Sequence, residues 1–287
     1  MDKQEILNKL DQIENLPTLP IAAQKTLELV SNKDSTMGQI AEAINRDQAI
    51  AARLIRLTNS AFYGFSNRIS SIQHSIVILG LNTVKNLVLG ISVVKTFADC
   101  RLSSSFNREQ FWIHTFSSAQ AAKSIAKYLR LPNEEDYFIA GLLHDIGILI
   151  IDQYFHDQFI QILEYSAKHN VSFLECEPDI LGITHGELGG HIVERWKVPD
   201  FIVDTLTYHH NPSQLKMKSE EYRTIVAIVH IADAKTQKEG IGTFINNFND
   251  NYDEAILKGI KLTEAKLDKI FVQVKKETNT LIREWGL

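Results

Sequence analysis

The 287-residue chain has few cysteines and no excess of positive charge. Cys100 and Cys176 are its two cysteines, and their spacing suits neither a disulfide framework nor a thiolate metal site. The formal net charge of −5 argues against general binding to nucleic-acid phosphates, which requires clustered positive charge. The composition therefore predicts a protein of a reducing compartment that does not bind nucleic acid.

The chain also lacks a long apolar run. Its most apolar stretch, residues 141–151, is too short to span a bilayer and contains a histidine and an aspartate. The first ten residues are polar and mixed in charge, unlike a signal peptide. With 44% hydrophobic and 23% charged residues, the composition is that of a globular protein. We therefore predict a cytoplasmic location and no membrane partner.

Apolar residues recur at helical spacing through most of the chain. Thr36 with Gln39, and Thr184 with Glu187, match the capping box, and Asp47 is an expected N-cap. No segment shows a convincing strand pattern, so the predicted fold class is all-α. The predicted helices cover 21–30, 40–44, 48–57, 84–97, a segment capped by Asn107, about 134–154, 156–169, 185–196, 199–210, 222–237 and a last helix from a Thr263 cap to about 285.

Residues 99–107 contain three consecutive serines and no strong periodicity. We place there the junction between an N-terminal helical subdomain, residues 1–100, and a larger helical domain, residues 101–287. Within the first subdomain, the loop at 59–65 carries three aromatic residues around Gly64. These aromatics either anchor the loop on the core or offer a surface to a protein partner.

Histidine and aspartate recur through the second part of the chain, at intervals of about 20 to 40 residues, the length of a helical hairpin. If the predicted helices pack as a bundle, these side chains can converge on its core. Imidazole and carboxylate without thiolate are suitable ligands for Fe, Mn, Ni or Zn. The candidate ligands are His114, His144, Asp145, His185, His209, His210 and Asp233.

Taken singly, most of these residues have a simpler explanation, as a core histidine, a helix-start residue, an exposed pair at a helix end or a surface acid. The pair of His144 and Asp145 differs, because it lies inside the most apolar stretch of the chain. A buried carboxylate is costly without a partner, so we expect a cation beside Asp145. Its two oxygens allow it to bridge two ions about 3.5–4 Å apart. The histidines that fit no such order are His74, His156, His169, His191 and His230, predicted as structural or solvated.

Several segments resemble the HDOD domain family, within residues 12–212. They are 15–20 (NLPTLP), 44–47 (INRD), 54–64 (LIRLTNSAFYG), 69–72 (ISSI), 79–84 (LGLNTV) and 140–147 (AGLLHDIG). HDOD domains are all-helical, similar in fold to the HD metal-dependent phosphohydrolases, and regarded as mostly regulatory in bacteria. The resemblance implies an HD-like helical bundle that carries an N-terminal helical subdomain.

Compared with the two-metal HD phosphodiesterases, the resemblance implies two divalent transition-metal ions. One would be held by His114, His144, Asp145 and Asp233, and the other by Asp145, His185, His209 and His210. Two positions depart from those enzymes. Their lysine three residues after the HD aspartate is here Ile148, and their carboxylate one turn before the first histidine is Gln110. The chain thus keeps the ligands and lacks a phosphate anchor.

Two functions follow from the resemblance. The first is a bacterial HDOD-type regulatory or signal-transduction protein, whose metal centre stabilises the fold or senses a ligand, with a signalling protein or a small phosphorylated molecule as partner. The alternative is a metal-dependent phosphohydrolase for a nucleotide-like phosphoester. In that case Asp145 and Asp233 would be the catalytic residues, and Arg195 or Lys197, unless merely solvated, would contact the phosphate. The isoleucine at position 148 favours the first function.

Overall fold

A computed structural model describes residues 2–13, 16–98, 106–216, 218–243, 245 and 252–287, and these residues form helices and no strand. The prediction of an all-α fold is therefore confirmed. The first helices are α1 (Lys3–Asp11), α2 (Ile21–Ser31), α3 (Met37–Asn45), α4 (Gln48–Thr58), α5 (Ile72–Leu79) and α6 (Leu81–Ala98). The others are α7 (Arg108–Tyr128), α8 (Glu134–Leu143), α9 (Ile146–Tyr154), α10 (His156–His169), α11 (Phe173–Ile180), α12 (His185–Arg195), α13 (Asp200–Tyr208), the 3-10 helix η1 (Pro212–Gln214), α14 (Glu220–Lys238), α15 (Glu254–Gly259) and α16 (Glu264–Trp285).

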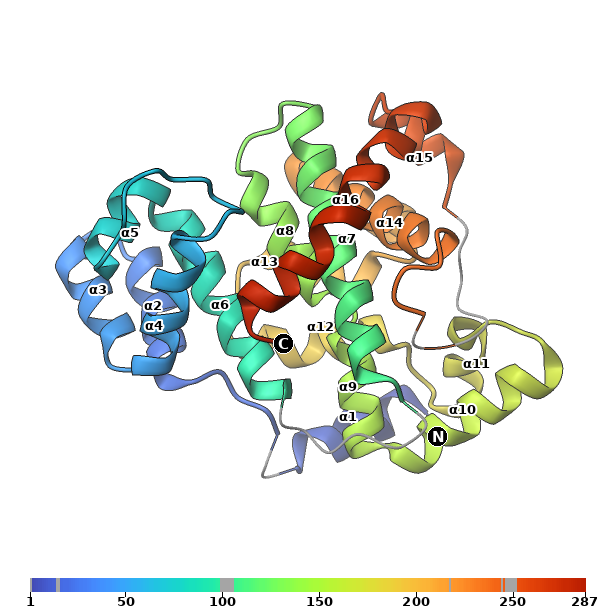
Figure 1. Cartoon of the computed structure of the whole chain (residues 1–287). Coiled ribbons are helices and arrows are strands. Elements are labelled where there is room, and N and C mark those ends of the chain that lie inside the picture. The colour runs from blue at the N-terminus through green and yellow to red at the C-terminus, as the bar shows by residue number, and fades with distance from the viewer. Residues whose placement is uncertain (1, 14–15, 99–105, 217, 244, 246–251) are drawn as a thin grey trace.

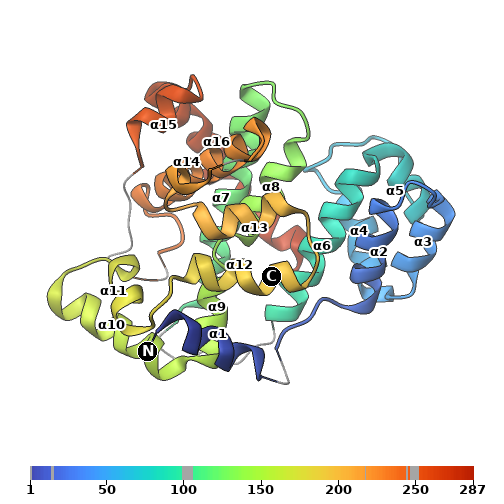
Figure 2. The same cartoon turned by 180° about the vertical axis from the view of Figure 1, so that it is seen from behind.

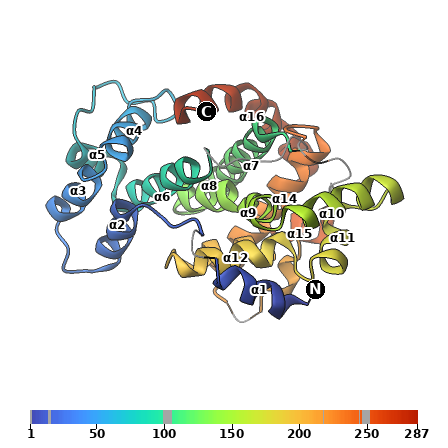
Figure 3. The same ribbon diagram turned by 90° about the horizontal axis from the view of Figure 1, so that it is seen from below.

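Helices α2 to α5 form a group at one side of the molecule, and α6 lies between this group and the remaining helices (Figure 1, Figure 3). Local capping starts two helices of the group as predicted. Thr36 and Gln39 form the capping box of α3, and the Asp47 carboxylate accepts the backbone N–H groups of Ala49 and Ile50 at the start of α4. The predicted junction at 99–107 lies mostly outside the described residues, as does Cys100, so the division near residue 100 stays a prediction.

Helix α7 is the central element of the larger part. Most of its side chains are buried, and it packs against α8, α14 and α16. Helix α16 runs along α7 and its C-terminal end reaches α4 (Figure 3). There the Arg53 guanidinium donates to the carbonyl of Trp285, and the N–H of Ala61 donates to the Glu284 carboxylate at 3.3 Å. The last helix thereby ties the α2–α5 group to the core.

The loop at 59–65 is anchored on this core. The Asn59 amide bonds both the carbonyl and the N–H of Ile69, at 2.7 and 2.8 Å. The Phe62 ring lies 5.7 Å from the ring of Phe138, centroid to centroid, and the Lys123 ammonium sits 3.9 Å from the Phe62 centroid. These contacts support an anchoring role for Phe62, whereas Phe65 is 41% exposed, and a surface for a protein partner stays a prediction.

The single helix predicted for 134–154 is divided into α8 and α9 by a turn at His144 and Asp145. The N–H of Ile148 donates to the carbonyl of Asp145, three residues back, at 2.9 Å, which tightens the chain at the start of α9. Thr263 occupies the N-cap position of α16 but makes no side-chain capping bond. Periodicity also missed the short helices α1, α5, α11 and α15, of six to nine residues, although it located α3 and α13, which have nine residues each.

Among the described residues, no single helix has both the length and the apolar character needed to cross a bilayer. One bent pair, 134–154 with 156–169, meets that test by length and composition alone.

Candidate metal centre

The structure brings all seven predicted residues to one place. They come from five parts of the fold: α7, the turn between α8 and α9, the first residue of α12, the chain just after α13, and α14. Six of the side chains are at most 1% exposed, and His210 reaches 9%. Helices α12 and α13 lie side by side over this region in the view from behind (Figure 2).

The first cluster consists of His114, His144, Asp145 and Asp233, each of which offers one atom within 4.8 Å of the others. Asp233 Oδ1 lies 3.0 Å from Nε2 of His114 and 3.6 Å from Nε2 of His144. Asp145 Oδ2 lies 3.5 and 3.2 Å from the same two nitrogens. Two imidazole nitrogens and two carboxylate oxygens therefore face one another.

The second cluster consists of Asp145, His185, His209 and His210. Asp145 Oδ1 lies 3.3 Å from Nε2 of His185 and 3.4 Å from Nε2 of His209. Nε2 of His210 lies 3.1 Å from Nε2 of His185. The two oxygens of Asp145 thus face different clusters, which is the arrangement of a carboxylate that bridges two ions.

Backbone carbonyls orient two of these imidazoles. Nδ1 of His144 lies 2.7 Å from the carbonyl oxygen of Gly141, and Nδ1 of His209 lies 2.8 Å from that of Leu206. Because a carbonyl only accepts hydrogen bonds, each Nδ1 carries the hydrogen. In a neutral ring the lone pair is then on Nε2, and in both rings Nε2 faces Asp145.

Glu177 orients the third imidazole, and sequence reasoning missed it. Its carboxylate, on α11 and fully buried, accepts from Nδ1 of His185 at 2.9 Å and from the His185 backbone N–H at 3.0 Å. Burial lowers the pKa of His185, but the charges and hydrogen bonds of Glu177 and Asp145 together outweigh it and raise that pKa to about 10. An acid before Pro178, in a segment without apolar periodicity, resembles a surface residue, so the sequence carries no clear signal for this role.

Among the described residues, Nε2 of His144 and both oxygens of Asp145 are buried without a hydrogen bond of acceptable geometry. Buried polar atoms normally have such partners. Here nitrogen and oxygen atoms face one another across little more than 3 Å, which is unfavourable unless a positive species, a proton or a metal ion, lies among them. Imidazole nitrogens and carboxylate oxygens fit a divalent transition metal, so the two clusters can hold metal ions.

The electrostatics keep the carboxylates of the centre ionised. Burial raises the pKa of Asp145, but His144, together with His185 and His209, outweighs it and holds that pKa well below its ordinary value. Burial likewise raises the pKa of Asp233, but the imidazoles of His114 and His144, 3.0 and 3.6 Å away, together hold that pKa well below its usual range. Burial, together with His209, lowers the pKa of His210 far below its ordinary value. The two negative charges also raise the pKa values of His144 and His185, so the centre favours a cation, either protons on these imidazoles or a metal ion in their place.

Glycines let the helices around the centre approach at backbone distance. A Cβ on Gly147 would lie 1.9 Å from the carbonyl oxygen of His185, and one on Gly186 would lie 2.6 Å from that of Leu206. Helix α12 therefore packs closely on α9 and α13. This approach carries His185 to the turn with Asp145 on one side and to His209 on the other.

His230, predicted as structural or solvated, is buried beside the centre. Its Nδ1 donates to the carbonyl of His209 at 2.7 Å, so it supports the chain after α13 and stands outside both clusters.

The fold and this centre define an all-helical protein with a buried histidine–aspartate cluster that can hold metal ions. The model of the HDOD domain family matches residues 16–212, and the chain belongs to that family.

Solved structures with the same fold include an HDOD domain protein of unknown function from Geobacter sulfurreducens, 25% identical, with a TM-score of 0.78 and 96% of each chain covered. A candidate phosphohydrolase from Shewanella amazonensis is 26% identical, with a TM-score of 0.71, 95% of this chain covered and 93% of that one. An uncharacterised protein of Treponema pallidum is 25% identical over 227 residues, which are 78% of this chain and 42% of the relative. The chain spans less than half the length of the curated relatives it matches.

Proposed function

We propose that this protein is an HDOD-type regulatory or signal-transduction protein with two divalent transition-metal ions, one in each cluster. The burial of the centre is the observation that carries this proposal. Six of the seven side chains are at most 1% exposed, and the most exposed, His210, reaches 9%. A phosphoester substrate would have to contact both ions directly, which requires access from solvent. The nearly complete burial of the ligands suits instead a metal centre that stabilises the fold.

The ions would connect elements that are distant in sequence. Ligands come from α7, the turn at Asp145, α12, the chain after α13, and α14. Metal that binds the folded state and not the unfolded chain stabilises the fold by mass action. The centre would therefore set the stability of the whole bundle, and any partner that reads this bundle would sense metal occupancy.

The three positions considered as phosphate anchors, Ile148, Arg195 and Lys197, do not supply one at the centre. Ile148, at the position of the lysine in two-metal HD phosphodiesterases, is fully buried among apolar side chains. Arg195 and Lys197 do not replace it, because Arg195 ends the 11-residue helix that begins with His185. At 1.5 Å per residue, the two ends are about 15 Å apart.

The second candidate function is a metal-dependent phosphohydrolase, and the complete ligand set favours it. The Shewanella relative is named a phosphohydrolase candidate, which is a statement about that protein. In this function bound metal would supply positive charge to the phosphate, Asp145 would hold both ions and Asp233 would accept a proton. The substrate would have to enter beside His210, which is the most exposed of the seven side chains.

Elemental analysis combined with a hydrolysis screen tests the proposal. We expect about two transition-metal ions per chain, and no hydrolysis of linear or cyclic nucleotides above the level of Asp145→Asn. A metal content near zero would contradict the metal centre. Turnover by the wild-type protein that Asp145→Asn abolishes would overturn the regulatory function in favour of the phosphohydrolase.

A further inference from the structure

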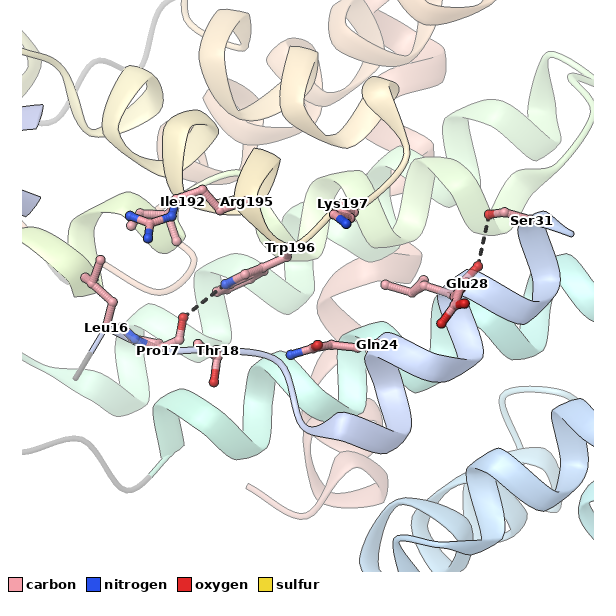
Figure 4. A pocket seen from close by; sticks show the side chains of 11 residues that line it. Leu16, Pro17, Thr18, Gln24, Glu28, Ser31, Ile192, Arg195, Trp196 and Lys197 are labelled. Carbon is pink, nitrogen blue, oxygen red and sulfur yellow. Dashed lines mark hydrogen bonds between the residues drawn. The ribbon is translucent and has the colours of Figure 1, made fainter. Parts of the chain in front are cut away.

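A cavity of about 530 Å³ lies between α2 and the C-terminal end of α12, away from the metal centre (Figure 4). Small-molecule sites in proteins occupy about 300–1,000 Å³ and combine apolar walls with a few polar groups. The chain at 16–18 closes one side of this cavity, and Gln24 and Glu28 of α2 face Trp196 across it (Figure 4). Its size and place, between the α2–α5 group and the helix that begins with His185, suit a ligand site.

Trp196, which is 8% exposed, contributes part of an aromatic wall to the cavity. Its indole Nε1–H donates to the carbonyl of Pro17 at 3.0 Å, which holds the ring in one orientation. The apolar side chains of Leu16, Leu27 and Ile192 complete this wall. A planar ring can pack on such a surface, because aromatic pairs gain contact area and favourable ring geometry together.

The rim of the cavity carries positive charge. Lys197 is exposed and, in the part of the chain that the structure describes, is not in an ion pair. Arg195 is paired with Asp11 at 2.7 Å, but both side chains are about half exposed, and such a pair contributes little. The lining also contains one acid, Glu28, which pairs with Lys25 at 2.9 Å in a similarly exposed and therefore weak pair. An anionic group can therefore bind at Lys197, whereas Arg195 points to the other side of Trp196 and stays with Asp11 (Figure 4).

We propose that this cavity binds a mononucleotide, with the base beside Trp196 and the phosphate at Lys197, which lies on the opposite side of Trp196 from Arg195 (Figure 4). Gln24 donates through Nε2 to the carbonyl of Leu19 at 2.7 Å, which leaves its Oε1 as an acceptor for a base amino group. The proposal deepens the regulatory function above, because it names the ligand class. Binding would join α2 to the far end of the helix that begins with His185.

The indole signals of the full-length, metal-loaded protein test the site directly. The chain has three tryptophans, Trp112, Trp196 and Trp285, and hence three indole N–H signals in a nitrogen–proton NMR spectrum. We expect AMP, or another nucleotide of a panel with GMP, CMP and UMP, to shift the Trp196 signal at millimolar concentrations. Adenosine and inorganic phosphate, each tested alone, should bind more weakly than AMP. A panel that leaves the Trp196 signal in place overturns the proposal.

Trp112 provides an internal control, because it lines a different cavity, between α7 and α16. A nucleotide that shifts the Trp112 signal and not the Trp196 signal binds elsewhere, and that outcome also overturns the proposal.

Two lysine-to-glycine variants separate binding from stability. Lys197 and Lys261 both have left-handed backbone, with φ of 54° and 59°, a conformation that glycine adopts freely. Neither Lys197→Gly nor Lys261→Gly should therefore destabilise the fold. Loss of one charge-assisted contact should weaken AMP binding about three- to tenfold in Lys197→Gly, whereas Lys261→Gly should bind as the wild type does.

Equal AMP affinity in the two variants would refute the role of Lys197. AMP binding that a chelator abolishes and Lys197→Gly leaves unchanged would assign the nucleotide to the metal centre and overturn the cavity. Failure of the metal proposal itself is recognised separately, by the metal content of the protein.

Discussion

Replacing Glu177 by glutamine tests how the second metal cluster is built. The buried Glu177 carboxylate uses both oxygens, one toward Nδ1 of His185 at 2.9 Å and one toward the His185 backbone N–H at 3.0 Å. Glutamine has a similar shape but a single acceptor oxygen, and its NH2 group cannot accept from Nδ1–H. The imidazole would then favour the tautomer with hydrogen on Nε2, the atom that faces Asp145. That tautomer has no lone pair for a metal ion.

The expected size of the effect follows from the role of such outer partners. Losing a group that orients a metal-ligating histidine usually lowers metal affinity by about 10- to 100-fold. This corresponds to about 1.4–2.8 kcal/mol of binding free energy. In a chelator competition, we expect Glu177→Gln to lower the affinity for one of the two ions by this factor. The metal content should fall from about two ions per chain toward one, and the circular dichroism spectrum should stay unchanged.

Glu175→Gln is the matched control. Glu175 lies on the same helix, is exposed, and forms a capping box with Ser172 that glutamine can also form. It should keep the metal affinity of the wild type. A Glu177→Gln protein that holds two ions as tightly as the Glu175→Gln protein would refute the orienting role of Glu177.

Asp145→Asn should remove both ions, because the two oxygens of Asp145 face different clusters. Asp233→Asn should remove one ion, because Asp233 belongs to one cluster. An Asp145→Asn protein that retains two ions would contradict the bridging role of Asp145. Gly147→Ala places a Cβ 1.9 Å from the carbonyl oxygen of His185, so its free energy of unfolding in urea should fall by about 1–3 kcal/mol or more. The control is Gly259→Ala, where the added Cβ has no atom within 4 Å, and this protein should not lose stability. Asp47→Ala removes the N-cap of α4 and should cost about 1–2 kcal/mol at neutral pH. Burial raises the pKa of Asp47, but the N–H bonds of Ile50 and Ala49 and the charge of Lys95 together lower it. The charged cap therefore contributes its full stability above the ordinary pKa of aspartate. The difference in unfolding free energy between wild type and Asp47→Ala should disappear as the pH falls through the lowered pKa.

Interactions between close neighbours in the sequence were the most predictable part of this protein. The capping boxes at Thr36 and Thr184 and the cap at Asp47 are confirmed, because each depends on atoms two or three residues apart. Apolar periodicity located the long helices for the same reason. It failed for α11, which is eight residues long and contains Pro178.

Part of the candidate site was also predictable. The apolar surroundings of His144 and Asp145 indicated a buried carboxylate in need of a positive partner, and both residues are fully buried. The family resemblance grouped the other five residues with this pair, and the structure places all seven together. Metal binding itself stays a prediction that elemental analysis tests.

Only the tertiary structure decided how these side chains face one another. The turn that divides α8 from α9, the opposite directions of the Asp145 oxygens, and the bond from His185 to Glu177 all depend on the packing of helices. So does the cavity beside Trp196, whose indole bonds a carbonyl 179 residues away. Periodicity and capping are properties of a single helix, whereas these contacts arise from the approach of different helices, which no local pattern in the chain specifies.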